Sequence, residues 1–70
     1  MMVYEMRAEY APDATSGPVR RWHMTRNGDL SALCGHAVAA DAETMSEDGW
    51  GKTLAPFCHL CGALYLRQVV

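Results

Sequence analysis

The feature that most constrains this chain is a pair of cysteines, Cys58 and Cys61, separated by two residues in a chain of only 70 residues. A domain of this size buries only about 60% of the surface of its unfolded chain, so it usually needs a disulfide, a metal or a partner to stay folded. The chain has three cysteines, and three cannot all pair within one chain. Metal binding is therefore the leading explanation for how the fold is stabilised.

Four potential ligands occur in the order His23, Cys34, Cys58 and Cys61. Structural zinc sites take four nitrogen or sulfur ligands in a tetrahedron, and Cys₃His is one of the usual sets. We expect residues 58–62 to form a turn that holds two of the sulfurs together, with a glycine at its end in the left-handed conformation. The sequence thus predicts one Zn²⁺ ion in a structural site.

The Asn-Gly pair at residues 27–28 is the strongest short signal for a tight turn between two strands. It lies between residues 22–25 and 30–34, which we expect to pair as a β-hairpin. In the register set by this turn, His23 and Cys34 are diagonal neighbours on the same face, roughly 7–8 Å apart at the backbone. A slip of one residue would place them on opposite faces, so the turn and the ligand set support each other.

Two other histidines compete with His23 for the nitrogen position. His36 follows Cys34 by two residues, but the hairpin register does not place it on the shared face. His59 lies between the paired cysteines, where an intervening side chain points away from the metal. We prefer His23 as the ligand, and replacement by His36 stays open.

The other segments predict a small α+β domain, with the zinc-bound core at about residues 20–66 of a single domain spanning 1–70. Residues 3–10 alternate between apolar and polar, which is the period of a half-buried strand. Residues 63–70 favour a short C-terminal helix, although their tyrosine and valines also suit a strand. The expected architecture is therefore a β-hairpin, an N-terminal strand and a short C-terminal helix.

The middle of the chain has weaker signals. Residues 35–51 show no sustained hydrophobic pattern, and we expect them to be the most mobile part. Residues 50–57 are expected to return as a short strand that leads into Cys58. Trp50 lies between two glycines, so it either folds over the metal site or remains exposed as an anchor for a partner.

Charge and hydropathy argue against nucleic-acid and membrane functions. The formal net charge is −2, and the basic cluster at residues 20–26 is more typical of a solvated strand face than of a phosphate-binding surface. No run approaches the ~20 consecutive apolar residues of a membrane span, and the first residues lack the pattern of a signal peptide. We expect a cytoplasmic protein with no membrane contact.

An enzymatic zinc site is not expected. Residues 56–61 resemble the Pro-Cys-x-x-Cys element of zinc deaminases with one residue inserted, but neither His23 nor His36 is followed by the His-x-Glu glutamate that acts as general acid and base. Four protein ligands also leave no open position for a water molecule. We expect a non-enzymatic module for protein–protein interaction or regulation, with a nucleic-acid-binding zinc finger as the alternative.

The Trp-His pair at 22–23, the turn at 27–28, the Ala-Leu-Cys-Gly segment at 32–35 and the Cys-x-x-Cys motif at 58–61 together resemble the small His-Cys₃ zinc-finger proteins of actinomycetes. The resemblance covers roughly residues 20–66. It implies no particular activity. It does imply the zinc ligands, namely His23, Cys34, Cys58 and Cys61.

Overall fold

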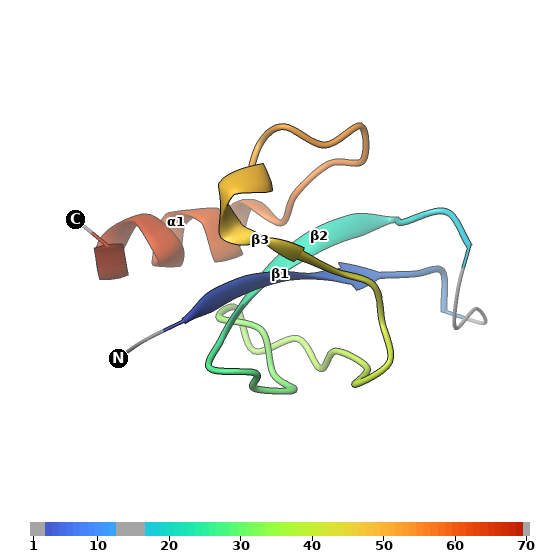
Figure 1. Cartoon of the computed structure of the whole chain (residues 1–70), viewed down its shortest axis with the longest axis horizontal. Coiled ribbons are helices and arrows are strands. Elements are labelled where there is room, and N and C mark those ends of the chain that lie inside the picture. Colours follow the sequence, from blue (N-terminus) through green and yellow to red (C-terminus); the bar gives the residue numbers. More distant parts are fainter. Residues whose placement is uncertain (1–2, 13–16, 70) are drawn as a thin grey trace.

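The computed structural model describes residues 3–12 and 17–69 of the chain. Its elements are, in order, β1 (Tyr4–Glu9), β2 (Arg21–Arg26), β3 (Thr44–Ser46), the short 3-10 helix η1 (Glu47–Gly49) and α1 (His59–Val69). The strands form one antiparallel sheet in the order β2-β1-β3. Figure 1 shows α1 and η1 on one side of the sheet and most of the segment between β2 and β3 on the other. The predicted α+β fold and C-terminal helix are therefore confirmed.

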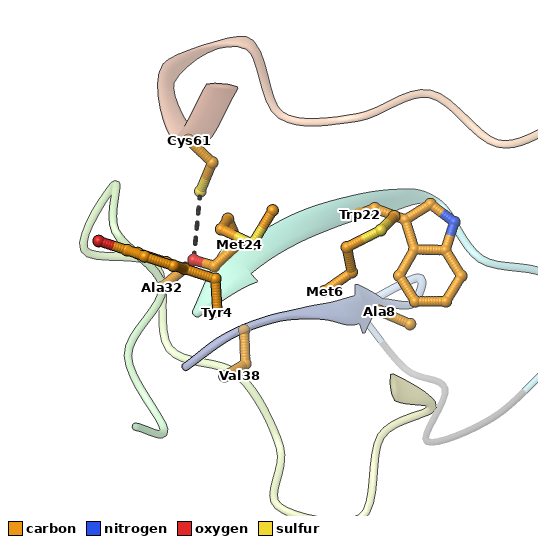
Figure 2. Packing of buried hydrophobic residues seen from close by; sticks show 8 residues of the cluster. All are labelled: Tyr4, Met6, Ala8, Trp22, Met24, Ala32, Val38 and Cys61. Atoms are coloured by element: carbon orange, nitrogen blue, oxygen red, sulfur yellow. Dashed lines mark hydrogen bonds between the residues drawn. The ribbon is translucent and has the colours of Figure 1, made fainter. Parts of the chain in front are cut away.

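The core lies on the face of the sheet that α1 covers. Met6 of β1 is opposite Met24 of β2, Ala8 is opposite Trp22, and all four side chains are buried. These residues alternate with polar ones along each strand, so pairing β1 with β2 gives the sheet one continuous apolar face. Figure 2 shows them together, with Cys61 reaching from the start of α1 toward Met24.

The opposite face of the sheet carries buried polar side chains. Arg7 is 7% exposed and donates hydrogen bonds from Nη1 to the carbonyls of Ala39 (3.1 Å) and Ala40 (2.9 Å). These bonds fasten the segment between β2 and β3 to this face. His23 is opposite Arg7 in the register, so it belongs to the polar face rather than to the core.

The predicted hairpin is only partly present. The turn forms, with the positive φ of 55° at Asn27 and 72° at Gly28 that a two-residue hairpin turn requires. The strand predicted for residues 30–34 does not form, and that prediction was wrong. Leu33 contacts β2 through a single backbone hydrogen bond, from its N–H to the carbonyl of Met24 at 2.9 Å.

The second strand of the hairpin does not form because residues 30–32 bond to residues 36–38 instead of to β2. Ser31 forms an isolated bridge with Ala37, and the Ala32 N–H donates to the carbonyl of His36 at 2.8 Å. Gly35 allows the chain to reverse between them, because its φ of 93° is accessible to glycine at little steric cost. The strand that does pair along the whole of β2 is β1.

The middle of the chain contains short regular elements. Residues 35–51 include β3, which pairs with the second edge of β1, and η1. Residues 50–57, all of which the structure describes, form no strand, so the strand predicted there is wrong. They end instead in an isolated parallel bridge between Phe57 and Trp22, which still leads the chain along β2 into Cys58.

The helix α1 begins earlier than predicted, at His59, so it includes Cys61. Gly62 lies inside this helix and is not among the residues with positive φ, so the expected left-handed exit after the cysteine pair is wrong. A Cβ atom on Gly62 would lie 3.4 Å from Nε1 of Trp50. Trp50 is thus half-buried against α1, with its ring 5.0 Å from that of Phe57.

Candidate metal centre

The structure brings together the four residues that the sequence singled out. One ligand atom from each of them lies within 4.8 Å of every other, and the set is His23, Cys34, Cys58 and Cys61. Nδ1 of His23 is 3.5 Å from Sγ of Cys34 and 3.6 Å from Sγ of Cys61. Zinc bonds of about 2.0–2.3 Å at tetrahedral angles place nitrogen and sulfur ligands about 3.6 Å apart. The spacing of these donors therefore fits a four-coordinate zinc ion.

The outer edge of β2 positions three of the four donors. β2 is an edge strand of the sheet, and His23 lies between two residues whose backbone carbonyls point outward. Cys58 donates its N–H to the carbonyl of Trp22 at 2.8 Å, and Leu33 donates to the carbonyl of Met24 at 2.9 Å. These two bonds bring the segments that carry Cys58 and Cys34 to either side of His23. The predicted proximity of His23 and Cys34 is thus observed, although it arises from one docking bond rather than from a hairpin.

The first turn of α1 positions the Cys58 and Cys61 sulfurs. The Gly62 N–H donates to the carbonyl of Cys58 at 3.0 Å, and the Cys61 N–H lies 3.5 Å from Sγ of Cys58. Burial alone would raise the pKa of the Cys58 thiol, but hydrogen bonds from the Cys61 N–H and from neighbouring groups lower it below its ordinary value. The helix start thus favours a thiolate at Cys58.

Cys61 is fully buried, and this burial raises its pKa to about 12. A thiol in such an environment stays protonated unless a cation is present, because an isolated thiolate is poorly solvated there. Coordination by a divalent metal ion deprotonates a thiol outright. The chemistry of this residue therefore suits a metal ligand better than a free nucleophile.

His23 has a second polar partner that the sequence did not reveal. Its Nε2 lies 2.5 Å from Oε1 of Glu9, and both side chains are largely buried. Burial lowers the pKa of the His23 imidazole, while the hydrogen bond that the ring donates to Glu9 opposes this effect. A neutral ring that donates from Nε2 has a free lone pair on Nδ1, on the side of the three sulfurs.

The other two histidines lie outside the cysteine cluster. The ring of His36 stacks on that of His23, with centroids 4.7 Å apart and planes at 6°, and its side chain is about half exposed. Glu9, His23 and His36 form a second group whose potential ligand atoms lie within 4.8 Å of one another, close enough to hold a metal ion. His59 is exposed and its ring lies 5.3 Å from that of Phe57. The structure thus places His23, and not His36, beside the three sulfurs.

No family model, curated protein or solved structure matches the chain. Among the described residues, no helix has both the length and the apolar character needed to span a bilayer. The function must therefore be inferred from the geometry of the site itself.

Proposed function

We propose that the chain is a small zinc-binding module with a structural metal. The observation that carries this proposal is the convergence of three sulfurs and one imidazole nitrogen within 4.8 Å. Thiolate and imidazole donors in a set of four are those that Zn²⁺ takes in structural sites. The resemblance to small His-Cys₃ zinc-finger proteins supports the same ligands, which are His23, Cys34, Cys58 and Cys61.

The role we propose is not enzymatic. Four protein donors complete a tetrahedral zinc ion, so no position is left where a water could be activated or a substrate polarised. The metal would instead tie β2 to the turn that carries Cys34 and to the start of α1. These three segments are separate and short, so a common ion would contribute directly to folding.

A protein partner fits the surface better than a nucleic acid does. Arg20 and Arg21 each have a nitrogen 3.6 Å from a carboxylate oxygen of Glu9, so the basic cluster is partly neutralised within the chain. Three thiolates bound to one divalent ion would add a further charge of −1 to the net charge of −2, which brings it to about −3. Such a charge disfavours binding that depends on phosphate contacts.

The apolar surface beside α1 supports the protein partner. A shallow pocket is lined by Trp50, Phe57 and Leu66, and the Leu66 side chain is 60% exposed. Exposed apolar surface of this kind is typical of contacts with proteins. The three cysteines are unpaired, and we propose a reducing compartment such as the cytoplasm, where thiols persist.

Metal content and ligand identity test this proposal together. We expect about one zinc per chain by elemental analysis and by native mass spectrometry. In cadmium-substituted protein, the metal should couple to the imidazole of His23. His23→Ala should abolish tight zinc binding, because the three sulfurs then lack their fourth partner.

His36→Ala and His59→Ala are the matched controls, since both rings lie outside the cysteine cluster. Both variants should keep one zinc and the wild-type circular dichroism spectrum. A folded wild-type chain that holds no metal would contradict the proposal. A cadmium coupling to His36 would show that the ligand set is wrong.

A further inference from the structure

We propose that Glu9 is a positioning residue of the metal centre and sets its metal affinity. In this arrangement the Glu9 carboxylate accepts the Nε2–H of His23 and holds the ring with Nδ1 facing the sulfurs. The inference rests on the proposed function, because it concerns the same site. It adds that the N-terminal strand β1, which supplies none of the four donors, controls how tightly they bind.

The two nitrogens of His23 have different partners, and this identifies the protonated one. Nε2 is 2.5 Å from Oε1 of Glu9, whereas Nδ1 is 3.5 and 3.6 Å from the sulfurs of Cys34 and Cys61. An ionised carboxylate can only accept a hydrogen bond, so the single proton of a neutral imidazole must be on Nε2. Histidines that bind metals usually donate their second ring N–H to such a group, which fixes the tautomer and the ring orientation.

The position of Glu9 is itself fixed by the fold. Glu9 is paired with Arg21 in the register of β1 and β2, so it is a diagonal neighbour of His23 on the polar face. Its two carboxylate oxygens also lie 3.6 Å from nitrogens of Arg20 and Arg21. The side chain is 14% exposed, so these contacts and the bond to His23 leave it little freedom to move.

The face of the His23 ring is constrained as well as its edge. His36 stacks on it with the two planes nearly parallel. The ring is thus held by Glu9 at one nitrogen and by a second imidazole over its face. With the ring held in this way, Nδ1 faces the two sulfurs before any metal arrives, so less ordering is needed when the metal binds.

Zinc affinity and the state of the His23 ring test the proposal. We expect Glu9→Ala to weaken zinc binding by about 10–100-fold in competition with a chelator of known affinity. Glu9→Gln keeps an oxygen acceptor at the same place, so its affinity should lie between those of Glu9→Ala and the wild type. Glu43→Gln is the matched control, because it removes the same charge from an exposed side chain beside β1 and should leave the affinity unchanged.

Nitrogen-15 NMR of the zinc-loaded protein gives a readout that a purely structural role would not change. The wild type should show a His23 ring protonated at Nε2, with a proton signal shifted downfield by the carboxylate. That signal should move upfield in Glu9→Gln and exchange with water in Glu9→Ala. If Glu9→Ala fails to fold with zinc present, the affinity and the spectrum of Glu9→Gln decide the question.

Three results would overturn the proposal. The first is wild-type zinc affinity in both Glu9 variants, with one zinc still bound. The second is a His23 ring protonated at Nδ1. The third is a second zinc equivalent that disappears in His36→Ala, because Glu9 would then be a ligand. Failure of the proposed function is distinct from all three, since it would appear as a wild-type chain without zinc.

Discussion

Hydrogen-bond partners of partly buried side chains in this fold determine when these side chains ionise. Tyr65 of α1 donates a hydrogen bond of 2.5 Å to Oε2 of Glu47 in η1. This bond, together with burial, raises the pKa of Tyr65 to about 12. The folded state therefore retains the phenol proton above pH 10, where an ordinary tyrosine loses it. The stability that this bond supplies is fully present below about pH 10 and is lost as the pH rises toward 12.

Substitution of Glu47 tests this interpretation at the scale of one residue. Glu47→Gln keeps an acceptor but removes the negative charge, so the Tyr65 phenol should ionise at a lower pH, as followed by phenolate absorbance. Tyr65→Phe should lower the free energy of unfolding by about 1.5 kcal/mol, the usual size for a hydrogen bond to a charged group. The difference between the spectra of wild type and Tyr65→Phe isolates this tyrosine from the other two. Identical titration of wild type and Glu47→Gln would refute the assignment.

At the level of secondary-structure elements, two glycines have different roles. One is Gly28 of the Asn-Gly turn, and the other is Gly62, which follows the Cys-x-x-Cys motif. Gly28 has a φ of 72°, which an L-residue adopts only with strain, and nothing lies within 4 Å of a Cβ atom placed there. Gly62 is helical, and a Cβ atom there would be in ordinary contact with Trp50 and Phe57, at 3.4 and 3.5 Å. The first glycine is required by the backbone, whereas the second is not.

The two alanine variants should therefore differ in their effect on stability, and only Gly28→Ala should lower it. Gly28→Ala should lower the free energy of unfolding by about 1 kcal/mol, because alanine disfavours a positive φ. Gly62→Ala should leave it unchanged or raise it by up to about 1 kcal/mol, because alanine is the better helix former. Denaturant unfolding of the zinc-loaded proteins measures both. A large loss of stability in Gly62→Ala would mean that the contact with Trp50 cannot relax.

The elements that the sequence predicted well are those that local patterns define. The alternation over residues 3–10 and the apolar residues after Cys61 predict β1 and α1, and the Asn-Gly pair predicts the turn. Strand pairing was not predictable in this way, because two segments could equally pair with β2. The contact between Glu9 and His23 depends on that pairing, so no local signal pointed to it.

The four donors could nevertheless be grouped from the sequence, because few residue types bind zinc through nitrogen or sulfur. Three cysteines and one histidine make a complete set of four zinc ligands, and this set could be recognised from the sequence before the fold was known. The choice between His23 and His36 was harder, since it depends on which segment docks on β2. The second strand of the hairpin from which His23 was predicted does not form, yet His23 is the histidine that lies beside the sulfurs.

At the scale of the whole molecule, the proposed metal links segments that are separated by up to 38 residues, as between His23 and Cys61. We expect chelation of zinc to unfold the chain, and acidification to release zinc and unfold it in a single transition. Protons compete for the thiolates and the imidazole, all of which must be deprotonated to bind metal. Burial also lowers the pKa of His23, so the unfolded chain binds more protons below about pH 6.5 and stability falls with falling pH.

Circular dichroism and zinc release followed by a colorimetric chelator should give coincident curves. Cys61→Ser should be unfolded even at neutral pH, because it removes a buried sulfur from the set. Leu54→Ser, at a fully exposed position, is the control and should unfold with the wild-type curve. Zinc loss well before the loss of secondary structure would show that the metal is not coupled to folding.

The docking of the ligand segments on β2 has a consequence for solubility. An uncovered edge strand offers a row of free backbone groups to which another chain can add a strand. Here the carbonyls of Trp22 and Met24 are occupied by the segments that carry Cys58 and Cys34. Loss of the metal would release these segments and uncover the edge beside a hydrophobic face. In the proposed zinc-bound state the site would therefore protect this edge from intermolecular strand addition, so the ion proposed to stabilise the monomer would also keep it from aggregating.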